Sequence, residues 1–176
     1  QKIERRQCDV LVIGGGPAGS TVAPMLADKG HRVVMLEKAH HPRFHIGESL
    51  LPANLPLFER MGIAEEVKAI GMLKPGAEFV SPNHDMSSVF CFAEAWDKSM
   101  PYAYQVRRDQ FDTVLIRNAA KKGVEVHEGC KAKAVEFLPD NTVLVRAVHD
   151  DGSESEWHAR FLVDASGRDT FLANRF

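Results

Sequence analysis

Residues 8–19 read Cys-Asp-Val-Leu-Val-Ile-Gly-Gly-Gly-Pro-Ala-Gly, an apolar run that ends directly in a glycine-rich turn. The run Cys8–Ile13 is rich in β-branched residues, which predicts a strand buried on both faces. The turn matches the spacing G-x-G-x-x-G at Gly14, Gly16 and Gly19. A strand that leads into this spacing is typical of nucleotide-binding α/β units.

A helix is predicted to follow the turn and to end at Gly30. Its apolar face is expected to hold Ala18, Val22, Met25 and Leu26. A second strand, Arg32–Leu36, is closed by the acid Glu37. Because a proline inside a helix removes a hydrogen bond, we expect a kink at Pro24 and not the end of the helix.

Each glycine of the turn has a physical task. Gly14 permits the tight turn, Gly16 lets the backbone approach a pyrophosphate, and Gly19 lets helix and strand pack closely. The start of the helix, at Pro17 and Ala18, offers free N–H groups and a partial positive charge to phosphates. The alternative is a glycine turn without a ligand.

Glu37 is the acid expected in such a unit, about 20 residues after the turn. Its carboxylate can accept hydrogen bonds from both hydroxyls of a ribose. It would also repel a 2′-phosphate, so the site favours FAD or NAD over NADP.

Composition narrows the function further. The chain has 176 residues with 44% hydrophobic and 26% charged residues, which predicts one globular domain, or one and part of another. A net charge of -2 predicts neither a nucleic-acid surface nor an anionic-membrane surface. No apolar stretch approaches the roughly 20 residues of a membrane span. The sequence starts at Gln1, which we take as a processed or trimmed N-terminus.

The cysteines Cys8, Cys91 and Cys130 are odd in number and have no close pair. They predict neither a disulfide scaffold nor a zinc site, and we expect a reducing, cytoplasmic location. His40, His41 and His45 lie close together, but no cysteine or carboxylate completes a ligand set at metal spacing, so we expect no metal.

Two further regions are predicted to form strands. The first covers residues 78–80, 88–92 and 103–106, whose phenylalanines are either sheet core or part of a substrate-facing surface. The second covers residues 124–126, 132–137, 142–148 and 157–163, with turn residues between them. We expect this second region to be an antiparallel meander inserted in an otherwise parallel sheet.

The sequence after Glu37 carries a more specific resemblance. Residues 14–20 (GGGPAGS), Glu37 and residues 42–52 (PRFHIGESLLP) together resemble the flavin-dependent halogenases. These belong to a larger class of flavoproteins with aromatic hydroxylases and geranylgeranyl reductases. Residues 104–112 (YQVRRDQFD) and 163–175 (VDASGRDTFLANR) are similar to two further flavin-binding segments of that class.

The resemblance implies FAD as cofactor and a Rossmann-like, glutathione-reductase-type α/β fold. Residues 1–72 and 107–176 would form the FAD-binding domain, with an inserted antiparallel meander, and residues 73–106 would begin a substrate-side sheet. Members of the class continue past the position of Phe176 with a third flavin segment, so we expect this chain to be an N-terminal portion.

Several single residues gain candidate roles. Arg43 can pair with a phosphate or flank the adenine, or it can be a solvated loop residue. The Ser49 hydroxyl can approach the flavin or the pyrophosphate, or it can cap a helix. The resemblance places Arg108 beside the flavin, and it adds further cofactor-binding residues, which are Lys38, Ala132 (through its backbone), Asp164 and Gly167. Asp112 is expected to form a structural ion pair.

Residues 71–79 resemble the segment in which halogenases carry their catalytic lysine, which makes Lys74 the candidate here. In that chemistry reduced flavin, oxygen and halide give hypohalous acid, and the lysine amine holds the halogenating species beside an electron-rich substrate. Partial burial suits the amine, because it favours the free base. The alternative is a surface lysine before a turn.

The leading hypothesis is therefore the FAD-binding portion of a halogenase-like oxidoreductase that acts on an aromatic or other electron-rich small molecule. A flavin reductase or NAD(P)H would supply electrons, and we expect neither nucleic acid nor a membrane as partner. The alternatives are a flavin-dependent hydroxylase, a double-bond reductase of the geranylgeranyl-reductase type, and a non-catalytic nucleotide-binding fragment.

Overall fold

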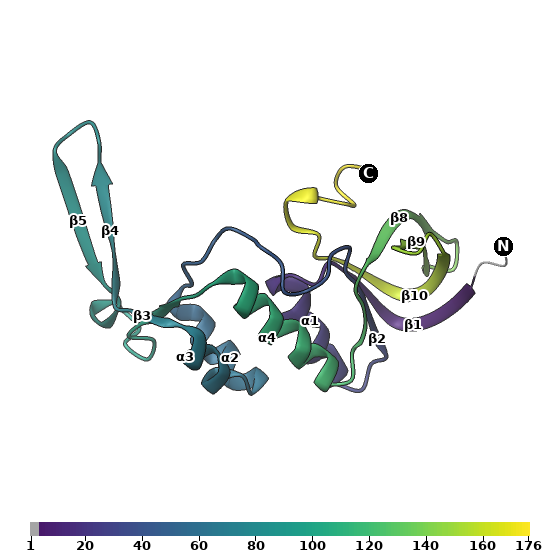
Figure 1. Ribbon diagram of the computed structural model, residues 1–176, viewed down its shortest axis with the longest axis horizontal. Helices are drawn as coiled ribbons and strands as arrows, with labels where there is room; N and C mark the ends of the chain where they lie inside the picture. The colour runs from purple at the N-terminus through teal and green to yellow at the C-terminus, as the bar shows by residue number, and fades with distance from the viewer. Residues whose placement is uncertain (1–3) are drawn as a thin grey trace. The chain divides into compact units, whose positions relative to one another are not determined.

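The computed structural model describes residues 4–176, which divide into two compact units. One unit contains the described residues up to Arg43 together with Asp112–Phe176. The other contains Phe44–Phe111. Each unit has its own sheet structure, shown in Figure 1, and is described separately.

The first unit is built on a six-stranded sheet with the strand order β7-β2-β1-β10-β9-β8. Its strands are β1 (Glu4–Ile13), β2 (Val33–Leu36), β7 (Glu125–His127), β8 (Cys130–Phe137), β9 (Val143–His149) and β10 (Glu154–Asp164). The pairs β7-β2, β2-β1 and β1-β10 are parallel, while β10-β9 and β9-β8 are antiparallel. The predicted meander is therefore present in β8, β9 and β10, and β10 belongs also to the parallel part. The prediction is wrong for residues 124–126, because β7 pairs in parallel with β2 at the other end of the sheet.

The strand register brings three strand ends to one level. Ile13, the last residue of β1, pairs with Leu36 of β2 on one side and with Asp164 of β10 on the other. The carboxyl ends of parallel strands in open α/β sheets are where ligands bind. The glycine-rich turn, Glu37 and the segment after Asp164 consequently meet at the same edge.

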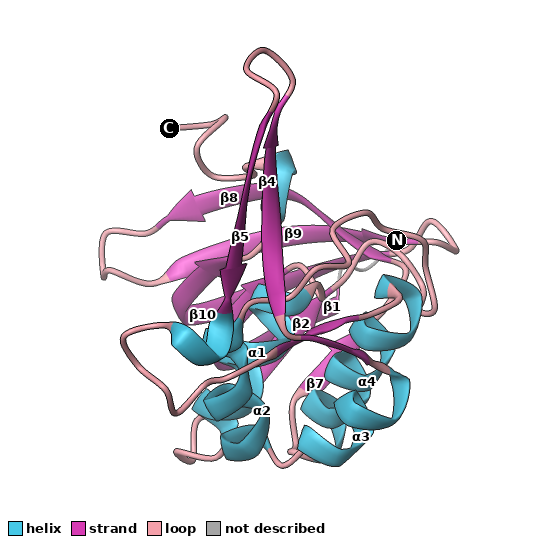
Figure 2. Ribbon diagram, turned by 90° about the vertical axis from the view of Figure 1, so that its left-hand side faces the viewer, coloured by secondary structure: helices cyan, strands magenta, loops and turns pink. Residues whose placement is uncertain are grey.

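The helices α1 (Pro17–Ala27) and α4 (Arg108–Lys121) supply one layer of this core. Ala23 of α1 and Ile116 and Ala119 of α4 are buried in one cluster with residues of β1 and β2. On the opposite face, buried residues of β1 and β2 share a cluster with Cys130, Ala132 and the fully buried Trp157 of the meander. Figure 2 shows α1 and α4 below β1 and β2, with β8 and β9 above those two strands.

Helix α1 runs through Pro24 to Ala27, so the proline does not end it. The predicted apolar face is confirmed for Val22 and Leu26, which are partly buried and pack against the cluster of α1, α4, β1 and β2, and it is wrong for Ala18, which is exposed. The fully buried residues of α1 are Gly19, Ser20, Ala23 and Pro24. Small residues face the sheet because the helix lies so close to β1, and Pro24 needs no donor partner there.

The second unit contains two short helices and two small antiparallel sheets. These are α2 (Leu55–Met61), α3 (Ala64–Ile70), the pair β3 (Met72–Lys74) and β6 (Ala103–Gln105), and the hairpin β4 (Gly76–Ser81) and β5 (Met86–Cys91). Single 3₁₀ turns cover Pro52–Asn54 and Phe92–Glu94 here, and Gly167–Asp169 in the first unit. The ring of Phe58 packs edge-on against Phe111, with 5.8 Å between the ring centroids.

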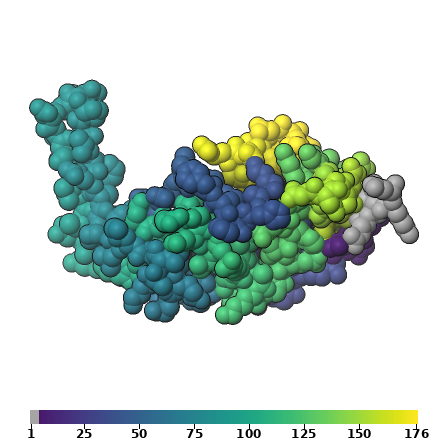
Figure 3. All heavy atoms as spheres, in the orientation of Figure 1, coloured from purple at the N-terminus to yellow at the C-terminus, as the bar shows by residue number. Residues whose placement is uncertain are grey.

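The β4–β5 hairpin is a single layer of two strands, visible as the upright arm in Figure 3. Phe79, Val80 and Val89 are each about 70% exposed, and Phe90 is half exposed. The interpretation of these phenylalanines as sheet core is therefore wrong for Phe79 and Phe90. Phe92 is buried, but it lies in the 3₁₀ turn Phe92–Glu94 and not in a strand. A hairpin this short has no second layer to cover its side chains.

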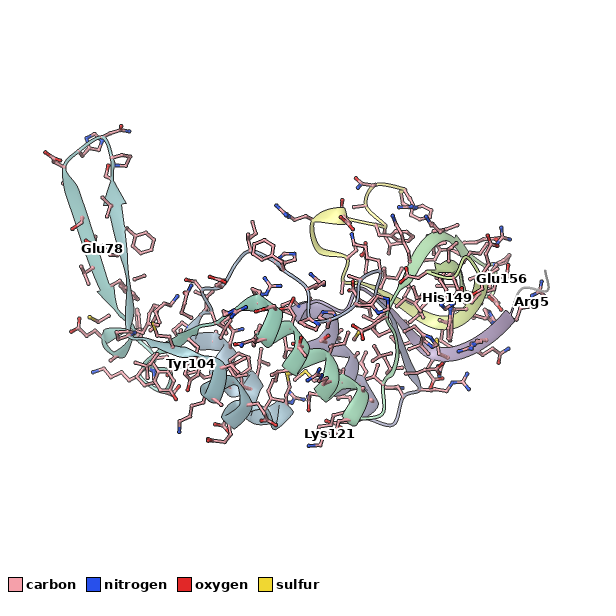
Figure 4. All side chains as sticks on the ribbon, viewed as in Figure 1. Arg5, Glu78, Tyr104, Lys121, His149 and Glu156 are labelled. Atoms are coloured by element: carbon pink, nitrogen blue, oxygen red, sulfur yellow. The ribbon has the colours of Figure 1, made fainter. Side chains whose placement is uncertain are left out.

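The amino end of β1 and β10 carries a network of charged side chains. Glu156 is 5% exposed, and its carboxylate accepts hydrogen bonds from Nε of Arg5 and Nε of Arg146, both at 3.0 Å. Figure 4 shows Arg5 and Glu156 beside each other at this end. The guanidinium of Arg6 lies 5.1 Å from the ring centroid of Trp157.

Candidate functional site

The glycine-rich turn joins β1 to α1, and backbone contacts require its outer glycines. Gly14 has a φ of +104°, which L side chains rarely adopt. A Cβ at Gly14 would collide with the carbonyl group of Ala165, and a Cβ at Gly19 would collide with the carbonyl oxygen of Gly14. The sequence predicted a tight turn and close helix–strand packing, and the structure has both.

Helix α1 begins at Pro17, and no side chain caps its N-terminus or adds an acid to its first turn. The first N–H groups of a helix have no partners within the helix, and its N-terminus carries partial positive charge. Within 4 Å of a Cβ at Gly16 there is a single neighbour, Nη2 of Arg43 at 3.6 Å. This end of α1 is therefore open to an anionic group.

Glu37 is fixed at the end of β2 and is only 3% exposed. Its Oε2 accepts the N–H of Gly15 at 2.6 Å, and its Oε1 accepts the N–H of Ala39 at 2.8 Å. Its backbone donates to the carbonyl of His127 and accepts from the N–H of Cys130. Each carboxylate oxygen has a further lone pair, so Glu37 can still accept hydrogen bonds from ribose hydroxyls.

Arg43 lies beside these two features. Its Nε is 3.9 Å from Oε1 of Glu37, and its Nη2 is 3.9 Å from Oδ2 of the fully buried Asp112. The Nε atom is buried and has no hydrogen-bond partner among residues 4–176. The solvated-loop alternative for Arg43 is therefore wrong, since its side chain is only 21% exposed. The ion pair predicted for Asp112 is confirmed.

The groups at this edge fit the ribose and pyrophosphate of a dinucleotide. The open end of α1 and the guanidinium of Arg43 suit phosphate oxygens, which a planar arginine can bind with two hydrogen bonds. The carboxylate of Glu37 suits ribose hydroxyls. These donors and the carboxylate acceptor, together with an incompletely satisfied arginine, fit the phosphate-bearing half of FAD.

Lys38, the next residue after Glu37, forms an ion pair with Asp169 of the 3₁₀ turn Gly167–Asp169. The hydrogen bond from Lys38 is the main reason why the pKa of Asp169 lies below its ordinary value. The pair links the segment after β2 to the segment after β10, and β1 lies between these strands in the sheet. Asp169 is a site residue that the sequence analysis did not single out.

Asp164 shapes the segment that follows β10. One carboxylate oxygen accepts from the N–H and hydroxyl of Ser166, and the other accepts from the N–H of Leu172 at 2.7 Å. Burial raises the pKa of Asp164, but these hydrogen bonds outweigh it and hold the pKa below its ordinary value. Gly167 follows with a φ of +67°, and Ala132 lies in β8 at a register shift.

In the second unit, residues 44–49 and Gln105 line an open hollow of 420 Å³. The guanidinium of Arg108 donates to the carbonyl of Ile46 at 2.9 Å and fixes the loop beside it. The Ser49 hydroxyl donates to Oε1 of Gln105 at 2.6 Å. The capping alternative for Ser49 is therefore wrong, because its hydroxyl bonds to a neighbouring strand.

Lys74 is the last residue of β3 and pairs with Ala103 of β6. Its Nζ lies 5.6 Å from the ring centroid of Phe92, within the range of a cation–π contact. The side chain is partly buried, so Lys74 has a defined place over an aromatic ring.

The structure groups the predicted cofactor residues by unit. It gathers Gly14–Gly19, Glu37, Lys38 and Arg43 with the segment after Asp164 at one edge, while Ser49, Lys74 and Arg108 belong to the other unit. The sequence analysis missed Gly15, whose N–H holds Glu37. The triple glycine was the only signal for it, because Gly15 lies outside the G-x-G-x-x-G positions.

Residues 4–176, the part of the chain that the structure describes, contain neither a metal-binding cluster nor a membrane-spanning helix. Among them, no group of three or more His, Cys, Asp or Glu side chains is placed to hold a metal ion, and no helix is long and apolar enough to cross a membrane. The three cysteines are free, and burial raises the pKa of Cys8 to about 12 and of Cys130 to about 11.

Known proteins share both sequence and structure with this chain. It is 40% identical over 174 residues to the flavin-dependent halogenase armH3 of Armillaria mellea, covering 96% of this chain and 34% of the relative. The myxobacterial chondrochloren halogenase CndH superposes with a TM-score of 0.85 at 42% identity, covering 92% of this chain and 38% of that one.

A flavoprotein/dehydrogenase of Cytophaga hutchinsonii superposes with a TM-score of 0.90 at 34% identity, covering 97% of this chain and 42% of that one. The chain spans about a third of the length of the curated relatives it matches. The family described as FAD binding domain matches residues 7–175. With its glycine turn, Glu37 and Arg43 assembled at one sheet edge, the chain belongs to the FAD binding domain family, and FAD is its cofactor.

Proposed function

We propose that this chain is the cofactor-binding part of a flavin-dependent halogenase-like oxidoreductase that acts on an aromatic or other electron-rich small molecule. One observation carries the proposal: 40% identity to a flavin-dependent halogenase extends over 96% of the chain. The similarity is thus not confined to the glycine-rich turn that many nucleotide-binding proteins share.

The first unit holds the phosphate-bearing half of FAD. The N–H groups at the start of α1, from Gly16 through Ala18 and Gly19, and the guanidinium of Arg43 bind the pyrophosphate, and Gly14 and Pro17 set the backbone there. The carboxylate of Glu37 binds ribose hydroxyls. Further contacts come from Lys38, Ala132, Asp164 and Gly167.

The second unit provides residues for the flavin and the substrate. Ser49 and Arg108, beside the hollow of 420 Å³, are proposed to contact the flavin end. Residues 73–106 are proposed to begin the substrate-side region. Residues 1–72 and 107–176 are proposed to form the FAD-binding domain. The exposed apolar side chains of the β4–β5 hairpin support a role for this region in binding apolar groups.

When bound in its reduced form, FAD would supply two electrons and two protons, so that oxygen, a halide ion, one further proton and a substrate C–H bond become two molecules of water and a carbon–halogen bond. Lys74 is the proposed catalytic residue. Its amine, held over the ring of Phe92, would hydrogen-bond the halogenating species and direct it to the substrate. A separate flavin reductase, or NAD(P)H directly, is the proposed electron source.

A Lys74→Ala variant of the intact protein tests this function. We expect halide-dependent product formation to fall by roughly 100-fold or more, as for loss of a catalytic group, while FAD affinity stays unchanged. The matched control is Lys68→Ala, because Lys68 is an exposed lysine of α3 whose ion pair, with Glu65 at 3.9 Å, is also exposed. Loss of FAD binding in Lys74→Ala would contradict the assigned role.

A second candidate is a flavin-dependent dehydrogenase or reductase, which the similarity to the Cytophaga hutchinsonii flavoprotein/dehydrogenase favours. The same variant separates the two functions. A reductase would retain its activity in Lys74→Ala and would need no halide for turnover.

A further inference from the structure

The adjacent histidines His40 and His41 lie between the ribose-binding acid and Arg43, and each meets a carboxylate. Nε2 of His40 lies 2.7 Å from Oδ2 of Asp150. Oε1 of Glu128 lies 2.7 Å from Nδ1 of His41 and also accepts the backbone N–H of His41 at 2.6 Å. Because a carboxylate only accepts, the His41 ring donates through Nδ1.

The two pairs differ sharply in burial. The side chains of His40 and Asp150 are 66% and 67% exposed, whereas those of His41 and Glu128 are 2% and 32% exposed. Exposed ion pairs contribute little because water and salt screen them. The His41–Glu128 pair combines low exposure with two hydrogen bonds to one oxygen, and so it constrains the chain at residue 41.

That constraint lies two residues before Arg43. After Glu37 the chain leaves the sheet, and the side chain of Arg43 reaches back toward it. The Nε of Arg43 lies 3.9 Å from Oε1 of Glu37, and its Nη2 lies 3.6 Å from the position that a Cβ at Gly16 would take. Glu128 belongs to the turn between β7 and β8, whose next residues bond back to the same segment: Gly129 N–H to Ala39 and Cys130 N–H to Glu37.

We propose that Glu128 is a positioning residue for Arg43. Glu128 holds the backbone and the ring of His41, and this fixes the position of the Arg43 guanidinium beside the glycine turn. Glu128 thereby raises the affinity for FAD without contacting FAD. The inference rests on the proposed role of Arg43 in binding the pyrophosphate. It gives the second histidine of the pair a function in cofactor binding that needs no metal.

A double-mutant cycle on FAD affinity tests the proposal, with Glu128→Ala, Arg43→Ala and the double variant titrated by flavin fluorescence. We expect Glu128→Ala alone to weaken FAD binding about tenfold, the fold-change that corresponds to one hydrogen bond to a charged group. In the Arg43→Ala background, Glu128→Ala should change FAD affinity by less than about twofold, because the side chain through which Glu128 acts is absent. Asp150→Ala is the matched control, since it removes the exposed pair, and should leave affinity unchanged.

Other outcomes overturn the inference. If Glu128→Ala is neutral, or if it weakens binding equally with and without Arg43, Glu128 does not act through that residue. If Arg43→Ala is itself neutral, the proposed role of Arg43 fails, and the inference with it, whereas the function assigned to Lys74 is unaffected. Should Glu128→Ala not fold, His41→Phe keeps a buried ring, removes Nδ1 and completes the same cycle. Its expected loss of FAD affinity is smaller, because the backbone N–H of residue 41 still donates to Glu128, but that loss should again disappear in the Arg43→Ala background.

Discussion

The two ends of strand β1 each place a buried carboxylate near arginines, and they differ in how the charges are satisfied. At the amino end, Glu156 accepts a hydrogen bond from each of two arginines at 3.0 Å. At the carboxyl end, Arg43 is 3.9 Å from Glu37 and has a buried Nε without a hydrogen-bond partner. Glu37 itself is held by backbone N–H groups.

The difference separates a structural network from a binding site. A carboxylate with two arginine donors needs nothing further, so the amino end contributes to stability alone. An arginine held near carboxylates without a hydrogen bond at Nε, next to an uncapped helix N-terminus, has capacity for an anion. The carboxyl end therefore retains unsatisfied groups, which we propose FAD completes.

The largest expected effect is at the glycine turn. Gly14→Ala forces a side chain onto a φ of +104° and against the carbonyl of Ala165, so we expect loss of measurable FAD binding and a strong fall in thermal stability. Gly30→Ala is the matched control, because Gly30 has a φ of +87° with nothing within 4 Å. It should cost about 1–2 kcal/mol of stability and leave FAD affinity unchanged. Equal effects of the two substitutions on FAD binding would contradict the account of the turn.

The next effect compares arginines at the two ends. Arg43→Ala should weaken FAD binding by roughly 100-fold, as for loss of a charge-assisted phosphate contact, and should also lower the melting temperature, because the buried Asp112 loses a cationic partner. Arg5→Ala removes an arginine from Glu156 and should leave FAD affinity unchanged, because Arg5 lies at the opposite end of β1. Titration of both variants by flavin fluorescence checks this. Similar losses in the two variants would show that general charge, and not the position of Arg43, governs binding.

Glu156→Ala should lower stability and leave FAD affinity unchanged. It removes two hydrogen bonds between a buried carboxylate and arginines that are themselves mostly exposed. We expect a loss of about 1–2 kcal/mol in the free energy of unfolding, because the arginines regain water. Chemical denaturation measures the effect. A stability equal to that of the unmodified protein would mean that the network contributes nothing.

The smallest expected effect concerns acid. Because hydrogen bonds hold the pKa of Asp164 below its ordinary value, its contribution to stability is present above the ordinary pKa of about 3.9 and is lost as the pH falls through the lower, folded-state pKa. Asp164→Asn should therefore be less stable than the unmodified protein at pH 6, and the gap should narrow toward pH 3. Thermal unfolding across this range measures the gap. A gap that widens on acidification would contradict the sign of the pKa shift.

Local sequence patterns were enough to predict the elements at the carboxyl ends of the parallel strands. The β-branched run before Gly14, the glycine spacing and the acid at Glu37 fixed the order of strand, turn, helix and strand, and the structure has these elements within a few residues of their predicted bounds. Turn residues between 124 and 163 likewise predicted the meander. Each of these signals involves residues that are close together in the chain, so the sequence alone is enough to recognise it.

What the sequence could not predict depends on distant contacts. Asp169 meets Lys38 across 131 positions, and Glu128 meets His41 across 87, so no spacing rule connects them. The most deeply buried residues of α1 were also missed, because close packing selects small residues that carry little hydrophobic signal.

One measurement tests the central claim most directly: FAD titration of Glu37→Ala beside Glu156→Ala. Both substitutions delete a buried glutamate from the same sheet, at 3% and 5% exposure, but at opposite ends of β1. We predict at least about tenfold weaker FAD binding for Glu37→Ala, which loses the acceptor for ribose hydroxyls, and unchanged affinity for Glu156→Ala. Equal affinities in the two variants, or a larger loss for Glu156→Ala, would contradict the assignment of the carboxyl edge as the FAD site.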